Sequence, residues 1–320
     1  MPNPTILCAT DLGPSGKQAL SLAAAFAAAT GAPLHVTHVC DAPMGEWPQT
    51  DPAIQAAIDV LHRRLRERVE RASESLASDV EALGRKIESM TTSVDEGRPW
   101  EAAVALAKRE SVGLLVVGPH RLSEEAGIAG KIKDRILGST ADRIARHAPC
   151  PVLISCGLVP STVAGKRWMV GVDFSEESAI ALREAHRLAY ATQGELILVH
   201  VLPQPFHEGD LPDDWREVVG SLAGLAEEKL RELAVETGVD VPCAFHVVPG
   251  RATHDLSSTA AELGVDFVVV GTRGHRGLVR AVLGSSAEML LRRSPVPVLI
   301  TRAESGPGLS AGSGAKGQRS

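Results

Sequence analysis

The hydrophobic positions of this chain fall into short apolar runs that alternate with longer segments of helical periodicity. The runs are rich in Val, Ile and Leu, which is typical of parallel strands buried on both faces. The segments between them carry Ala and Leu at helical spacing. The pattern predicts strands at Thr5–Thr10, Leu34–Val39, Ile87–Val94, Leu114–Gly118, Val152–Ser155, Trp168–Asp173, Leu196–Val201, Ala244–Val248, Phe267–Gly271 and Val298–Thr301.

The second half of the chain repeats the first. Asp11 and Asp173 each follow the first apolar run of their half, and Gly138 and Gly284 each precede a hydroxyl residue and a helical pattern. Alternating strands and helices predict an α/β fold with two tandem doubly wound domains, each with a five-stranded parallel sheet of order 3-2-1-4-5. We expect domains at 1–156 and 167–303, a linker at 157–166 and a disordered tail at 304–320.

The segment after the run Phe267–Val270 carries the clearest candidate chemistry. Gly271, Gly274 and Gly284 form the pattern G-x2-G-x9-G, and Ser285 and Ser286 begin the next helical pattern. Glycines let backbone amides approach a phosphate, and the first amides of a helix attract anions. The pattern resembles the nucleotide-binding signature of the universal stress protein family. That resemblance spans nearly the whole chain and implies ATP, or a similar adenine nucleotide, as a regulatory ligand in stress survival.

An aspartate and the glycine loop are expected to share one crevice, because strands one and four are neighbours in the predicted order. The predicted second-half site is Asp173, Val201, Gly271, Thr272, Arg273, Gly274, His275, Gly284, Ser285 and Ser286. Two structural alternatives stay open. Ser285 and Glu288 fit a capping box, and an aspartate between a strand and a helix is often an N-cap.

The first half departs from this pattern. Pro119 follows Gly118, so one amide donor is missing, and the loop before Gly138 is longer than its counterpart. The corresponding residues form a weaker candidate site: Asp11, Gly118, Gly138, Ser139 and Thr140. We expect weak or absent nucleotide binding there, with a structural or partner-binding role instead.

Composition narrows the function classes. A net charge of −6 argues against a nucleic-acid surface, and an aromatic content of 3% argues against base-stacking platforms. The five cysteines form no C-x-x-C pair, so neither a disulfide framework nor a thiolate zinc site is expected. Neither a secretory signal nor a bilayer-spanning run is visible, which favours a cytoplasmic protein.

No catalytic residues and no metal site are predicted. A slow ATP hydrolase and a nucleotide-independent interaction or scaffold protein are the alternatives, and whether Mg²⁺ accompanies ATP is left open. In the family that the chain resembles, domains pair along their last strands. The two halves are therefore expected to pair internally through Val152–Ile154 and Val298–Ile300, and a homodimer or an unknown protein partner is a further expectation.

Overall fold

The computed structural model describes residues 3–41, 52–84, 87, 89–119, 138–203, 213–272 and 283–302. The strands are β1 (Ile6–Thr10), β2 (Leu34–Asp41), β3 (Met90–Gly97), β4 (Leu114–Val117), β5 (Val152–Ile154), β6 (Arg167–Gly171), β7 (Glu195–Pro203), β8 (Cys243–Gly250), β9 (Phe267–Gly271) and β10 (Val298–Thr301). The helices are α1 (Pro14–Thr30), α2 (Pro52–Glu81), α3 (Pro99–Arg109), α4 (Ser139–His147), α5 (Glu176–Ala191), α6 (Asp213–Glu236), α7 (Ala252–Glu262) and α8 (Ser285–Arg293). The predicted tail at 304–320 lies outside the described residues.

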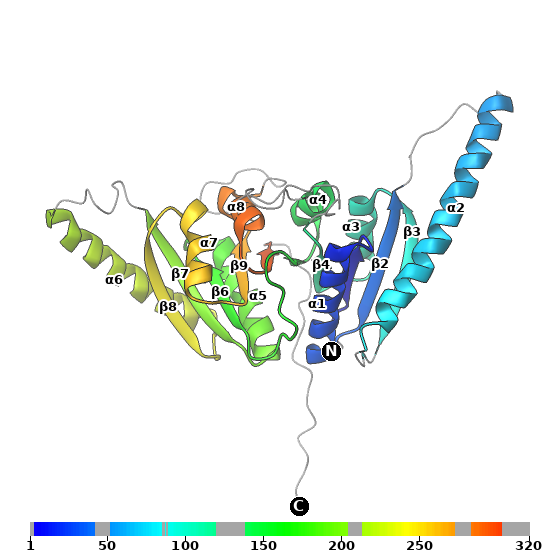
Figure 1. Ribbon diagram of the computed structural model, residues 1–320. Coiled ribbons are helices and arrows are strands. Elements are labelled where there is room, and N and C mark those ends of the chain that lie inside the picture. Colours follow the sequence, from blue (N-terminus) through cyan, green and yellow to red (C-terminus); the bar gives the residue numbers. More distant parts are fainter. Residues whose placement is uncertain are drawn as a thin grey trace, which may run out of the picture.

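All the strands named above belong to one sheet of order β3-β2-β1-β4-β5-β10-β9-β6-β7-β8 (Figure 1). Each half contributes five parallel strands, which confirms the predicted order 3-2-1-4-5. The halves join where β5 and β10 pair antiparallel, with Leu299 opposite Leu153. The internal pairing along the last strands is therefore observed, and it buries two apolar edges that would otherwise be open.

Helices cover the sheet on both faces. Buried residues of α1, α2, α5 and α6 share one core cluster, and those of α3, α4, α7 and α8 share the other. The first cluster runs across the junction between the halves. There Phe26 of α1 lies 5.9 Å from the ring of Trp168 and 5.8 Å from that of Phe267, and Trp168 stacks on Phe267 at 4.2 Å. These three aromatic residues thus join the two halves into one core.

The segment after β5 is held against the second half. Cys156 Sγ donates to Val296 O at 3.3 Å, and Leu158 N donates to Pro295 O at 2.7 Å. Gly157 between them has φ of 68°, and a Cβ added to it would lie 2.1 Å from Pro295 O. Only glycine fits this position, which requires both a left-handed backbone and a close approach.

The sequence placed one strand wrongly. The third strand of the first half was expected at Ile87–Val94, but β3 spans Met90–Gly97. This outermost strand has only one buried residue, Gly97, so its hydrophobic pattern is weak. Pairing with β2 sets its end instead, because Gly97 lies opposite Asp41.

The five cysteines form no disulfide with one another, and burial makes the thiols of Cys8 and Cys150 poor nucleophiles. Burial raises the pKa of Cys8 to about 12 and that of Cys150 to about 12, and it raises the pKa of the half-buried Cys243 to about 11. We therefore expect iodoacetamide at pH 8 to modify Cys243 first and to leave Cys8 and Cys150 unmodified. Mass spectrometry of peptides checks this against a sample unfolded in guanidinium, in which all five should react. Early modification of Cys8 in the folded protein would contradict the packing described here.

Candidate functional site

The candidate residues of each half lie at the carboxyl ends of two adjacent strands. In the first half β1 pairs with β4, with Ala9 opposite Val117, so that Asp11 and Gly118 leave the sheet side by side. In the second half β6 pairs with β9 in the same way, and Asp173 and Gly271 leave the same edge. Ligands of open α/β sheets bind at this edge, where the strand order reverses.

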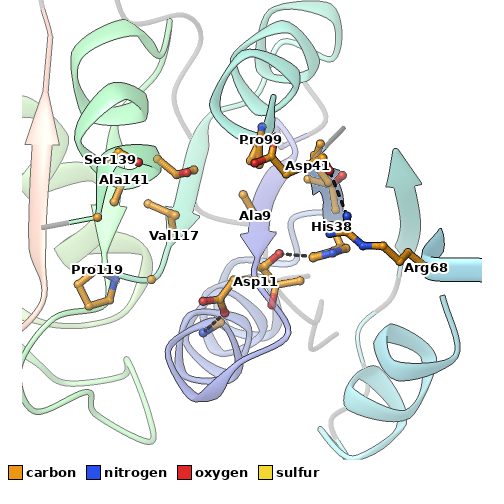
Figure 2. A pocket seen from close by; sticks show the side chains of 17 residues that line it. Ala9, Asp11, His38, Asp41, Arg68, Pro99, Val117, Pro119, Ser139 and Ala141 are labelled. Carbon is orange, nitrogen blue, oxygen red and sulfur yellow. Dashed lines mark hydrogen bonds between the residues drawn. The ribbon is translucent and has the colours of Figure 1, made fainter. Parts of the chain in front are cut away.

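A cavity of about 330 Å³ opens at this edge in the first half. The weaker candidate residues all line it: Asp11, Gly118, Gly138, Ser139 and Thr140. Figure 2 shows Ser139 on one side of the cavity and His38, Asp41 and Arg68 on the other. Its volume lies within the range of small-molecule sites in proteins.

Both aspartates bond to the start of the helix that follows them. Asp11 Oδ1 accepts from Gly13 N at 2.9 Å and from Gly16 N at 3.1 Å. Asp173 Oδ1 accepts from Ser175 N at 3.0 Å and from Ser175 Oγ at 2.5 Å. The capping alternative is thus partly realised, although the N-cap positions themselves are Gly13 and Ser175.

The residue after each aspartate has a left-handed backbone. Leu12 has φ of 61° and Phe174 has φ of 62°, at equivalent positions of the two halves. Residues with side chains rarely adopt this conformation, which costs free energy and is frequent at ligand sites. The same turn in both halves fixes the direction in which each aspartate leaves the sheet.

A histidine bonds to the same edge in each half. His38 Nδ1 contacts Thr10 O at 2.9 Å, and His200 Nδ1 contacts Val172 O at 2.8 Å. A carbonyl oxygen only accepts, so Nδ1 carries the proton and Nε2 remains an acceptor in the neutral ring. Each acceptor carbonyl belongs to the residue just before the aspartate, so the histidine ties the second strand of its half to the site (Figure 2).

The helix starts of α4 and α8 match each other closely. Their N-caps are Gly138 and Gly284, which have extended backbones and, as glycines, supply no side chain to cap the helix. The first bond within α8 runs from Glu288 N to Gly284 O. The amides of Ser285, Ser286 and Ala287 therefore have no acceptor within the helix and can serve a ligand or water. The capping box suggested by Ser285 and Glu288 is wrong, because Ser285 is the first residue of the helix rather than its N-cap.

Thr272 connects the second-half loop to this helix start. Its carbonyl accepts from Gly284 N at 2.7 Å, as Pro119 O accepts from Gly138 N at 2.8 Å in the first half. Thr272 is only 2% exposed, and its Oγ1 has no hydrogen-bond partner among the residues that the structure describes. A buried hydroxyl without a partner is costly unless a ligand or water completes it.

The other predicted residues lie as follows. Val201 is buried on β7, next to His200, and its counterpart Val39 lines the first-half cavity. Ser285 is exposed and Ser286 is partly exposed at the start of α8. Three predicted loop residues lie outside the described part of the chain: Arg273, Gly274 and His275.

Comparison with known proteins gives the family. The family model described as "Universal stress protein family" matches residues 2–155 and again residues 165–302. The chain belongs to the universal stress protein family. Both halves are matched, so the protein is a tandem universal stress protein with a role in the stress response.

Some relatives match this chain across both of its halves. A universal stress protein of Mycobacterium bovis is 27% identical over 293 residues, which cover 86% of this chain and 89% of the relative. The single-domain universal stress protein YxiE of Bacillus subtilis is 32% identical over 152 residues, covering 42% of this chain and 98% of the relative. The crystal structure of a universal stress protein from Archaeoglobus fulgidus has the same fold, with a TM-score of 0.63 and 22% identity over 93% of this chain and 98% of that structure.

Among the residues that line the first-half cavity, reasoning from the sequence did not propose the polar side chains of His38, Asp41 and Arg68. The sequence did hold a signal for His38, because the pair His38-Val39 is repeated as His200-Val201 in the second half. Arg68 lies on α2 and donates to Asp41 O at 3.2 Å, a contact for which the sequence carries no signal. Within the described residues no group of three potential metal ligands occurs, and no described helix is long and apolar enough to cross a membrane.

Proposed function

We propose that this universal stress protein binds ATP, or a closely similar adenine nucleotide, as a regulatory ligand at the carboxyl ends of the strands β6 and β9 of its second half. The observation that carries the proposal is the start of α8. Gly284, as the N-cap, offers no side chain to the first helical amides, and in the sequence the glycine segment that follows β9 precedes them. Such a helix start is a site for the phosphates of a nucleotide.

The other groups at the edge suit the nucleoside. Asp173 lies on the neighbouring strand end, where a carboxylate can accept hydrogen bonds from ribose hydroxyls. Val201 and His200 come from the end of β7, the next strand along, and give the base an apolar wall and an acceptor nitrogen. Thr272, the residue directly after β9, adds a buried hydroxyl group, Oγ1, that a ligand could contact.

Close packing at Gly271 supports the same proposal. A Cβ added there would lie 2.9 Å from the Cβ of Glu177 and 3.0 Å from its carbonyl oxygen. The loop can therefore leave the sheet close to α5 only without a side chain at this position. Gly118 has the same relation to Ser15 in the first half, with an added Cβ 2.9 Å from Ser15 O.

Calorimetric titration of the purified chain with ATP tests the proposal, together with mass spectrometry of any small molecule that co-purifies. We expect saturable binding with one strong site per chain, in the half with the intact motif. Two equal sites would show that the first-half cavity binds despite Pro119. Absence of both ATP binding and a co-purified nucleotide would leave a protein that acts through its surface alone. Release of phosphate from the same sample reports whether ATP is hydrolysed.

A further inference from the structure

Arg146 joins the two halves through α4 and α8, the helices that begin at the two candidate sites. Its Nε donates to the two carboxylate oxygens of Asp142 at 3.0 and 2.9 Å, and its Nη2 donates to Asp142 Oδ1 at 2.9 Å. The same Nη2 donates to Glu288 Oε1 at 2.7 Å. Asp142 and Arg146 belong to α4 and Glu288 belongs to α8, so one guanidinium bridges the two halves of the chain. The hydrogen bonds that Arg146 donates to Asp142 are the main cause that raises the pKa of Arg146.

The two carboxylates occupy equivalent places. Each lies in the first turn of its helix, four residues after the glycine N-cap, at the end that would receive phosphate. A carboxylate in the first turn interacts favourably with the helix dipole but repels a second anion at the same end. Both clefts therefore place a negative charge where the proposed ligand brings more, and Arg146 offsets both.

We propose that Arg146 is a shared counter-charge that sets the anion affinity of both clefts, so that phosphate binding in the second half depends on a side chain of the first. The inference rests on the proposed function, since a nucleotide supplies the anion. Arg146 is a positioning residue in this scheme: it acts through Glu288 and Asp142. Its side chain is 21% exposed, so salt screens its pairs less than it screens pairs at an open surface.

The chain supplies a matched control. Arg292 lies four residues after Glu288, at the position in α8 that Arg146 occupies in α4. It is exposed, and in the described residues it forms no ion pair with Glu288. Arg292→Gln removes the same charge from the facing helix without breaking the bridge. Any effect specific to Arg146→Gln is therefore an effect of the bridge rather than of net charge.

The experiment measures dissociation constants for ATP and for tripolyphosphate in the full chain and four variants: Arg146→Gln, Arg292→Gln, Glu288→Gln and Arg146→Gln with Glu288→Gln. We expect Arg146→Gln to weaken both ligands about five- to tenfold, from the loss of one compensating charge near the anion. Arg292→Gln should change affinity less than about twofold. The double variant should return to within about twofold of the parent, because the carboxylate at the start of α8 that Arg146 offsets is also gone, while Asp142 lies on α4 in the other half.

Rescue separates charge compensation from a purely structural bridge. A double variant as weak as Arg146→Gln overturns the proposal, and so does an Arg146→Gln chain that binds like the parent. If Arg146→Gln fails to fold, the single variant Glu288→Gln still tests the proposal. It should bind tripolyphosphate as tightly as the parent chain or more tightly. Weaker binding would count against the proposal. A parent chain that binds tripolyphosphate but not ATP refutes the proposed function alone. One that binds neither refutes both.

Discussion

Replacing Gly284 with aspartate should remove ATP binding from the second half without lowering the stability of the fold. The N-cap position has φ of −66° and ψ of 150°, a conformation that any residue adopts without strain. An aspartate there accepts from the free amides of the first turn of α8, which are the donors proposed for phosphate. It also adds a negative charge at the same end of the helix, so affinity should fall about 100-fold or more.

The stability readout makes this variant more informative than a bulky loop substitution. An aspartate N-cap is favoured over glycine by a few tenths of a kcal/mol, so the melting temperature should stay the same or rise slightly. Gly138→Asp is the matched control, because Gly138 is the N-cap of α4 in the half without the intact motif. If Gly138→Asp lost ATP binding and Gly284→Asp kept it, the ligand would belong in the first-half cavity.

Much of the fold could be predicted because the two halves carry the same pattern. Buried parallel strands such as β4 and β9 read as continuous apolar runs, and their positions were predicted to within a residue. Outer strands carry less information, as β3 shows. The end of β3 could have been predicted by comparing the halves, because Gly97 corresponds to Gly250 and β8 ends at Gly250.

Part of the site could be predicted, and part of it depends on contacts between distant segments. Asp11 was predicted because it follows an apolar run, and Gly138 because it precedes a hydroxyl residue and a helical pattern. Both line the cavity. Arg68 and Arg146 were not found, since Arg68 acts from the middle of α2 and Arg146 from the last turn of α4, each on a residue that only the folded chain brings near. From the sequence alone, a charged residue on a helix is interpreted as a solvated surface group, because its partner in the fold cannot be identified.

The aromatic cluster at the junction should make the two halves unfold as one unit. Trp168 is fully buried between Phe26 of the first half and Phe267 of the second, and replacing it with alanine should cost about 3–5 kcal/mol. Tyr190→Ala is the control, because Tyr190 is 54% exposed and its loss should change stability by less than about 0.5 kcal/mol.

Calorimetry and denaturant titration distinguish a shared core from two independent ones. With a shared core, Trp168→Ala and Phe26→Ala each lower one common transition, although the residues belong to different halves. Independent halves would instead give two transitions, of which each variant shifts only one. Trp168→Phe should be much milder than Trp168→Ala, because Trp168 Nε1 has no hydrogen-bond partner among the described residues and only ring volume is lost. The coupling matters for function, since the same junction brings Arg146 to Glu288: a chain whose halves separated would also lose the bridge between its two clefts.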